Sequence, residues 1–249
     1  MGKNNLSIAT ILAYFLMIFI NWYAESLPIN GVTMAEVSAS VSTLFTPPGY
    51  VFSIWLIIYL LLFIFVIYQF LPSQRCKSYY RQIRLPFIIT CLLNSIWVIL
   101  FHHFLFTWNL LTIIGLMIYL SIIYVVLNKH KCNFNGKEEL FVYFPFSIYF
   151  AWTTIAVIAN VSIVLVANGW GGWGISPVIW TMIVILLGLG LIIYIANKFR
   201  DPYVLLVYLW AYLGLVYKYL YTSYKGPLIV TLFACMVLMI NLIYIVQKE

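Results

Sequence analysis

The chain has 249 residues, of which 65% are hydrophobic and only 8% charged, and its formal net charge is +7. Soluble domains carry about 25% charged residues, so this composition excludes a water-soluble enzyme and indicates that apolar surface faces lipid. Only helices or closed barrels span a bilayer, and long apolar runs without alternation favour helices. We therefore predict an all-α polytopic membrane protein.

Runs that lack Asp, Glu, Lys and Arg mark the candidate spans, each of which needs roughly 20 residues. Residues 4–24 and 226–247 are each long enough for one helix. Residues 37–74 include a Thr-Pro-Pro-Gly turn signature at 46–49, which leaves one helix over residues 50–70. The first run stays a helix in this interpretation, because no small-residue cleavage site of a secretory signal follows it.

The two longest runs each predict a pair of helices. Residues 85–128 are interrupted by histidines at 102–103, and residues 140–197 are interrupted by the glycine- and tryptophan-rich segment 168–174. Each run is about twice the length of one span, so each is divided at its interruption.

The remaining run, residues 202–217, is short for a span. Lys218 follows it, and a lysine at a helix end can extend its ammonium group to the membrane interface. The helix can therefore continue to Tyr221, and the chain as a whole is predicted to have eight membrane helices.

The basic residues predict the orientation of these helices. If the N-terminus is cytoplasmic, only Lys218 and Lys225 fall in external segments, and the other eleven basic residues fall in cytoplasmic ones. This asymmetry predicts cytoplasmic N- and C-termini, in the plasma (inner) membrane, and it accounts for the net charge without a nucleic-acid partner. The eleven are Lys3, Arg75, Lys77, Arg81, Arg84, Lys129, Lys131, Lys137, Lys198, Arg200 and Lys248.

Aromatic residues make up 19% of the chain, and interfacial Trp and Tyr account for only part of them. Three groups at helical spacing remain, in which a tryptophan has aromatic, amide or small side chains as neighbours on the same face. Broad rings with a few orienting polar groups would suit a cavity for a flat hydrophobic ligand. The alternative is that the rings fill the core and the amides bond neighbouring helices. The groups are Phe52, Trp55, Tyr59 and Phe63; Asn94, Trp97 and Phe101; and Trp152, Ala156 and Asn160.

The same three regions carry motifs of one known family. Residues 46–59 read Thr-Pro-Pro-Gly-Tyr-Val-Phe-Ser-Ile-Trp-Leu-Ile-Ile-Tyr, residues 94–97 read Asn-Ser-Ile-Trp, and residues 151–160 fit Ala-Trp-x-x-x-Ala-x-x-x-Asn. They resemble, in order, helices 2, 3 and 5 of the TspO/MBR family, the tryptophan-rich sensory proteins related to the mitochondrial translocator protein. The resemblance covers residues 5–165.

The resemblance implies a five-helix bundle, commonly a homodimer, with a ligand pocket capped by the loop between helices 1 and 2. Residues 1–167 would form this TspO/MBR-like bundle, and residues 168–249 would add three transmembrane helices. The implied ligand is a porphyrin or another haem-like tetrapyrrole, with a sterol as the lesser candidate, and no cofactor is required. The pocket candidates carried over are Tyr50, Trp55, Asn94, Trp97, Trp152, Ala156 and Asn160.

One spacing departs from the family pattern at the start of the second helix. Phe52 and Trp55 are three residues apart, where the common short form has four. In an ideal α-helix this difference turns Trp55 by about 100°, so its place in the pocket depends on how the helix begins.

Three classes of function remain open. The first is a sensor or carrier that binds its ligand in the membrane, the second is a small-molecule transporter that uses the added helices, and the third is a membrane enzyme acting on porphyrin. The sequence assigns no catalytic or metal-binding residue, because the adjacent histidines 102–103 have no carboxylate or thiol beside them. Glu25 and Glu36 could act as acids over the pocket, although solvation in a loop is the simpler interpretation.

Overall fold

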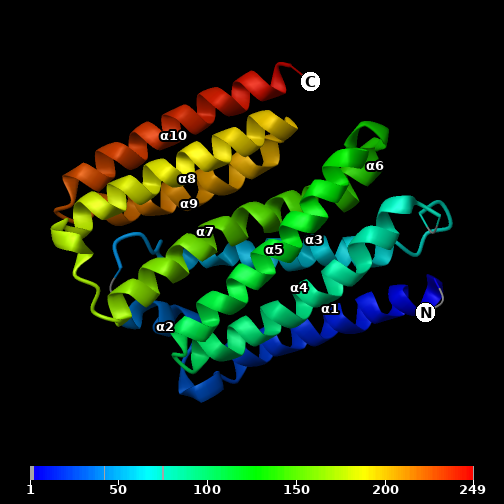
Figure 1. Cartoon of the computed structure of the whole chain (residues 1–249), viewed down its shortest axis with the longest axis horizontal. Helices are drawn as coiled ribbons and strands as arrows, with labels where there is room; N and C mark the ends of the chain where they lie inside the picture. Colours follow the sequence, from blue (N-terminus) through cyan, green and yellow to red (C-terminus); the bar gives the residue numbers. More distant parts are fainter. Residues whose placement is uncertain (1–2, 42, 75, 249) are drawn as a thin grey trace. The chain divides into compact units, whose positions relative to one another are not determined.

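The structure is a computed structural model that describes residues 3–41, 43–74 and 76–248. Every secondary-structure element in this part of the chain is a helix (Figure 1). Eight spans among these residues are long and apolar enough to cross a membrane, which confirms the predicted fold class and helix number. Their main helices are α1 (Lys3–Ser26), α3 (Ile54–Tyr68), α4 (Ser78–His102), α5 (Phe106–His130), α7 (Phe144–Ala167), α8 (Pro177–Phe199), α9 (Pro202–Leu220) and α10 (Lys225–Val246).

Short helical segments lie between or before the long ones. Two of them, η2 and η4, run directly into α3 and α7, and η4 is a π-helical turn. The short segments are η1 (Ile29–Gly31), α2 (Met34–Ser40), η2 (Gly49–Ser53), η3 (Lys131–Asn133), α6 (Gly136–Glu138), η4 (Glu139–Tyr143) and η5 (Gly172–Gly174).

The sharp turn between α8 and α9 shows how local sequence sets the helix ends. Arg200 ends α8 in a left-handed conformation with φ of 48°, and Asp201 then accepts a hydrogen bond from the backbone N–H of Tyr203 at 2.9 Å. Pro202 occupies the first turn of α9, where a missing N–H costs nothing. The connection between these two spans is therefore only two residues long, Arg200 and Asp201.

The start of α4 differs from the sequence prediction. The uncharged run begins at residue 85, but the helix begins at Ser78. Arg81 and Arg84 therefore lie on the first two turns of a membrane-length helix rather than in a loop. Arg81 is exposed at this helix end, where a long side chain can reach water or headgroups, whereas Arg84 is buried.

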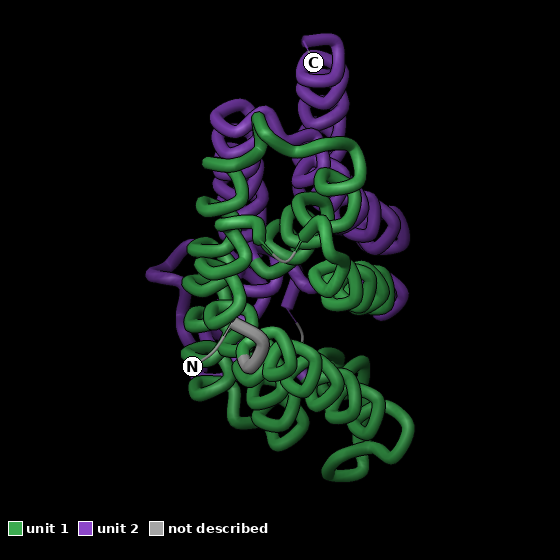
Figure 2. The backbone as a smooth tube through the Cα atoms, turned by 90° about the vertical axis from the view of Figure 1, so that its right-hand side faces the viewer, with its two compact units in different colours: residues 1–40, 55–153 green, residues 41–54, 154–249 purple. Residues whose placement is uncertain are grey.

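The described chain separates into two compact units (Figure 2). Unit 1 comprises residues 1–40 and 55–153, and unit 2 comprises residues 41–54 and 154–249. The division falls inside α7, whereas the sequence analysis placed a boundary at residue 168. The boundary at residue 168 separates the predicted ligand-binding bundle from the added helices. The division into compact units does not test ligand binding, so that boundary stays a prediction.

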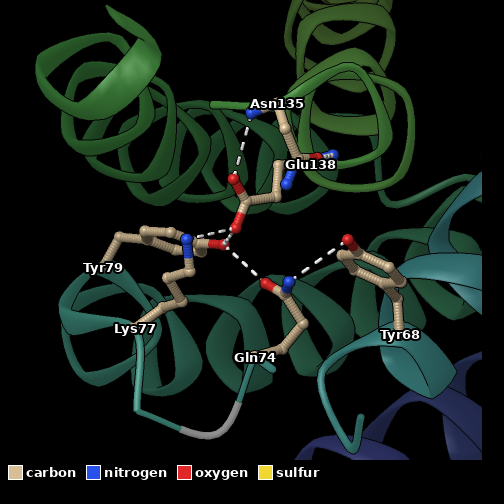
Figure 3. Close-up of polar contacts among 6 residues, drawn as sticks. All are labelled: Tyr68, Gln74, Lys77, Tyr79, Asn135 and Glu138. Atoms are coloured by element: carbon tan, nitrogen blue, oxygen red, sulfur yellow. Dashed lines mark hydrogen bonds and ion pairs between the residues drawn. The ribbon is translucent and has the colours of Figure 1, made fainter. Parts of the chain in front are cut away.

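Helix α4 is the central element of unit 1, where it packs along α5 and α1. Six polar residues also join the turn before α4 to the segment before α7 (Figure 3). We call them the Glu138 cluster: Tyr68, Gln74, Lys77, Tyr79, Asn135 and Glu138.

Glu138 is the centre of this cluster. Its carboxylate is 1% exposed and pairs with the ammonium group of Lys77 at 2.7 Å. It also accepts a hydrogen bond from the backbone N–H of Asn135 at 3.1 Å, and the Asn135 side chain in turn accepts from the N–H of Glu138 at 2.9 Å. This reciprocal capping box holds the carboxylate in place for the ion pair, and the two connecting segments of unit 1 are thereby held together.

In unit 2, α10 packs against α9 and α8. Two glycines allow close approach in this unit. A Cβ atom at Gly188 would lie 2.7 Å from the hydroxyl oxygen of Tyr212, and one at Gly214 would overlap Cγ2 of Val51 in η2. Helix α9 therefore meets the segment that carries the Pro-Pro-Gly motif at a position where no side chain fits.

We expect Gly214→Ala to lower the free energy of unfolding by about 1–2 kcal/mol, because overpacking costs more than the helix propensity that alanine adds. The control is Gly190→Ala on the exposed surface of α8, where a Cβ atom meets nothing within 4 Å. That change should be neutral or stabilising. Thermal unfolding of the two variants in one detergent tests the difference, and an equal response of both would contradict the close packing at Gly214.

Candidate functional site

The aromatic residues of the three motifs meet in unit 1 around Trp55. Its ring centroid lies 5.7 Å from that of Trp97 and 6.2 Å from that of Trp152, and the Trp152 ring is perpendicular to it. Tyr59 stacks on Trp55 at 5.5 Å, and Tyr149 meets it edge-on at 5.9 Å. We call these five residues the Trp55 cluster; they come from α3, α4 and α7.

The start of α3 explains why Trp55 points into this cluster. The preceding residues Gly49–Ser53 form the 3₁₀ helix η2, and the α-helix begins only at Ile54. Phe52 lies in η2 and Trp55 in α3, so their spacing crosses a change of helical period. The rotation of about 100° calculated for an ideal α-helix therefore does not apply to Trp55, whose ring lies in the cluster.

Asn94 connects the cluster to three helices through hydrogen bonds. Its side-chain amide nitrogen donates to the hydroxyl of Tyr149 at 3.2 Å, and its oxygen accepts from the amide of Asn21 on α1 at 2.9 Å. The oxygen of Asn21 accepts from the hydroxyl of Tyr59 at 2.6 Å. Asn94 is fully buried. It is therefore placed to fix the orientation of Tyr59 and Tyr149, the two tyrosines that contact Trp55.

The indole N–H of Trp55 is the unusual polar group in this cluster. The residue is only 7% exposed, and its nitrogen has no hydrogen-bond partner among the described residues. A buried donor without an acceptor costs about 1–3 kcal/mol. Core packing accounts for the ring contacts but not for this unpaired donor, which would be satisfied by an acceptor atom of a bound molecule.

The three other candidates carried over from the family motifs belong to unit 2. Tyr50 is 49% exposed, and its ring meets those of Trp210 and Tyr217 at 5.9 and 5.8 Å, nearly at right angles. Ala156 and Asn160 are buried on α7, where the Asn160 amide donates to the carbonyl of Ala156 at 2.7 Å. Of the seven candidates, the structure thus brings together Trp55, Trp97 and Trp152 directly, and Asn94 through the tyrosines.

Helix α9 holds the segment that leads into the Pro-Pro-Gly motif. The ammonium group of Lys218 donates to the carbonyl oxygens of Thr43, Leu44 and Thr46 at 2.9, 3.2 and 2.8 Å. Tyr219 donates to the Leu44 carbonyl at 2.9 Å. As the sequence predicted, α9 continues past Lys218, to Leu220, and the N–H donors of Lys218 are used by backbone carbonyls.

A further hydrogen bond attaches the same segment to α9. The indole N–H of Trp210 donates to the carbonyl of Val51 in η2 at 2.9 Å. Together with Lys218 and Tyr219, it makes residues 43–51 part of unit 2 through side chains of α9. The helices beyond residue 168 therefore position Tyr50, although they carry none of the three motifs.

The two glutamates of the predicted outer loop have local structural roles. Glu36 accepts hydrogen bonds from the backbone N–H and the hydroxyl of Thr33 at 2.7 and 2.8 Å, and this capping box starts α2. Those bonds hold the pKa of Glu36 below its ordinary value. Glu25 accepts from the backbone N–H of Met34 at 3.3 Å. Both carboxylates thus support the connection after α1.

His102 is fully buried at the end of α4. Its Nδ1 lies 2.8 Å from the carbonyl oxygen of Val98 one turn earlier. Among the described residues, no three His, Cys, Asp or Glu side chains form a group that could hold a metal ion.

Two residues of the site were missed by sequence reasoning. Tyr149 precedes Trp152 by three residues, a helical spacing that would have placed both rings on one face. Asn21 is an amide inside the first uncharged run, and an amide in hydrocarbon needs a partner from another helix. Its actual partners, Asn94 and Tyr59, lie 73 and 38 residues away along the chain, a distance over which no sequence pattern connects them.

Eight apolar helices and a buried aromatic cluster define an integral, multi-pass membrane protein. The profile of the TSPO-like protein family matches residues 7–246. The chain therefore belongs to the TSPO-like family, and the match continues through α8–α10, beyond the motifs recognised in the sequence. Comparisons with curated proteins and with solved structures gave no match.

Proposed function

We propose that this protein binds a flat hydrophobic ligand of the tetrapyrrole class at the Trp55 cluster and acts as a membrane sensor or carrier. The unpaired indole N–H of Trp55 is the observation that supports this proposal most directly. The surrounding rings offer stacking surface, and a carboxylate or carbonyl oxygen of the ligand would accept from the indole. The network through Asn94 would hold the tyrosines in place around the ligand.

Substitution of single tryptophans by phenylalanine tests this site. Trp55→Phe removes the unpaired N–H and part of the ring surface, and Trp97→Phe and Trp152→Phe remove ring surface beside it. We expect each to weaken binding about tenfold, equivalent to about 1.4 kcal/mol. The measurement is a titration of the detergent-solubilised full chain with protoporphyrin IX, followed by ligand absorbance so that the loss of a tryptophan does not change the signal.

The matched controls are Trp22→Phe and Trp108→Phe, because these rings are 56% and 64% exposed. Trp210 is unsuitable as a control, since its indole donates to Val51. Thermal unfolding is measured for every variant. Equal losses of affinity at all positions, proportional to the loss of stability, would show that the rings are ordinary packing and would exclude the proposed site.

Flux separates the proposed sensor or carrier from the alternative of a transporter. The full chain is reconstituted into liposomes with protoporphyrin IX on one side, and the ligand is measured on the other. Saturable binding without protein-dependent flux supports a sensor. Flux that disappears with Trp55→Phe would instead assign a transport function that uses the same residues.

We also propose that both termini face the cytoplasm, on the strength of the distribution of the basic residues. Reporter fusions after Lys137 and after Lys248 should both report a cytoplasmic location. An external reporter after Lys137 would reverse the orientation of the motif-bearing helices. An external reporter after Lys248 alone would mean that one of the last three helices does not span the membrane.

A further inference from the structure

Arg84 is a buried cation in unit 1 that no carboxylate neutralises. It lies on the second turn of α4, and only 5% of the residue is exposed. No ion pair joins it to an acidic side chain in the described part of the chain. A buried charge without a counter-ion is costly in an apolar environment. The preference of basic residues for cytoplasmic segments therefore does not by itself explain why Arg84 is buried.

The guanidinium group is held in a fixed orientation by a chain of buried side chains. Its Nε donates to the side-chain oxygen of Gln69 at 3.1 Å. The Gln69 amide nitrogen donates to the hydroxyl of Thr10 on α1 at 2.7 Å and to the carbonyl of Val66 at 3.1 Å. Both Gln69 and Thr10 are almost fully buried. The amide is thus fixed at both ends, which explains why it presents its oxygen to Arg84.

One face of the guanidinium also lies over an aromatic ring. The central carbon of the Arg84 side chain is 5.2 Å from the ring centroid of Tyr80. An arginine has five N–H donors, and the bond to Gln69 uses one of them. The remaining donors form the planar fork that binds two oxygens of a carboxylate or phosphate. The structure therefore presents an oriented donor group whose charge is not satisfied by the protein.

The depth of Arg84 suits an anion at the membrane surface. It lies six residues after the start of α4, about 9 Å along the helix axis at 1.5 Å per residue. The headgroup layer extends roughly 5–8 Å beyond the hydrocarbon core, so a helix that begins at its outer edge would place Arg84 close to the boundary of the core, from which a long side chain can reach a phosphate. The start of α1 and the turn between α3 and α4 are at the same end of unit 1 (Figure 1). Arg81, one turn before Arg84 on α4, adds an exposed positive charge.

We propose that Arg84, oriented by Gln69, binds a phosphate-type anion, either the headgroup of an anionic lipid or a soluble phosphate. This site is separate from the tetrapyrrole proposal, since its residues do not belong to the Trp55 cluster. The anion supplies the negative charge that the protein lacks, and the fork of N–H donors holds its oxygens. Occupancy stabilises the ends of α1, α3 and α4 against separation.

The test compares the thermal unfolding of the full chain in phosphatidylcholine nanodiscs with that in nanodiscs containing phosphatidylglycerol, and in phosphatidylcholine with inorganic phosphate. We expect phosphatidylglycerol to raise the unfolding temperature. An equal rise with inorganic phosphate assigns the site to a soluble anion. If neither addition has any effect, the proposal is wrong.

Two variants separate this site from general attraction between basic residues and anionic lipid. Gln69→Glu places a carboxylate beside Arg84, so the internal ion pair should reduce the apparent affinity for phosphatidylglycerol at least tenfold. Arg84→Gln should have the same effect on affinity if it folds. The control Arg81→Gln removes the same charge from an exposed position and should keep most of the response. If Gln69→Glu responds like the unmodified chain, or Arg81→Gln loses the response equally, the proposal is overturned.

Discussion

Replacing Lys77 with methionine is expected to lower the free energy of unfolding by about 3 kcal/mol, the lower part of the range for a broken buried ion pair. The reason is the asymmetry of the pair, in which Glu138 is 1% exposed and Lys77 is 39% exposed. Without Lys77, the carboxylate of Glu138 remains buried without its counter-charge. The backbone N–H of Asn135 at 3.1 Å and the hydroxyl of Tyr79 at 3.5 Å still donate to it, but both are neutral.

The reciprocal change, Glu138→Gln, should cost less, about 1 kcal/mol, the net value of a hydrogen bond. A glutamine oxygen can still accept from the N–H of Asn135, and the freed ammonium of Lys77 can turn to water. The control is Lys137→Met, an exposed neighbour of Glu138. Chemical unfolding at pH 7 in one detergent compares the three variants. A larger loss for Glu138→Gln than for Lys77→Met would contradict the assignment of the buried charge to Glu138.

Much of the helical architecture could be predicted from the sequence because lipid imposes a simple constraint. A span must be apolar over roughly 20 residues, and charged residues lie in or next to the connections between the long helices, except those between α4 and α5 and between α7 and α8. The start of α4 was placed late because Arg81 and Arg84 are helical. An arginine side chain is unfavourable in contact with lipid tails, but it is compatible with a helix. The uncharged run therefore marks the part of α4 that can face lipid and not the full length of the helix.

The composition of the Trp55 cluster was partly predictable, since helical spacing groups residues on one face. The orientation of Trp55 was not, because it depends on the 3₁₀ turn Gly49–Ser53. Spacing arguments assume one helical period, and a change of period within the motif shifts every later residue. Asn21, which joins Asn94 to Tyr59, comes from a helix without any recognised motif.

The attachment of residues 43–51 to α9 also could not be predicted, because it joins parts of the chain more than 150 residues apart. In the sequence, Lys218 has the features of a residue at a membrane interface. A lysine near a helix end has the same local sequence whether it meets water or backbone carbonyls. The prediction that the helices after residue 168 lie outside the ligand site is therefore best tested at this attachment.

We expect Lys218→Met to free residues 43–46 from α9 and to lower the free energy of unfolding by about 2–3 kcal/mol, because hydrogen bonds to a charged group contribute about 1.5–3 kcal/mol. Methionine keeps the length and apolar stem of the side chain but removes the donor to the carbonyl oxygens of Thr43 and Thr46, while that of Leu44 keeps Tyr219. Lys218→Arg should not restore the attachment fully, since a planar fork cannot direct its donors as a rotatable ammonium group does.

Hydrogen exchange measures the attachment, because the backbone amides of residues 43–46 and 49–51 should exchange faster once the segment is released, and Pro47 and Pro48 have none. A loss of 2 kcal/mol corresponds to roughly thirtyfold faster exchange in this segment. Lys225→Met, at an exposed position at the start of α10, should leave the exchange unchanged. If Lys218→Met exchanges as slowly as the Lys225 variant, the three carbonyl bonds do not hold the segment. If exchange accelerates while protoporphyrin IX affinity stays constant, the segment is held by α9 but Tyr50 does not contribute to ligand binding.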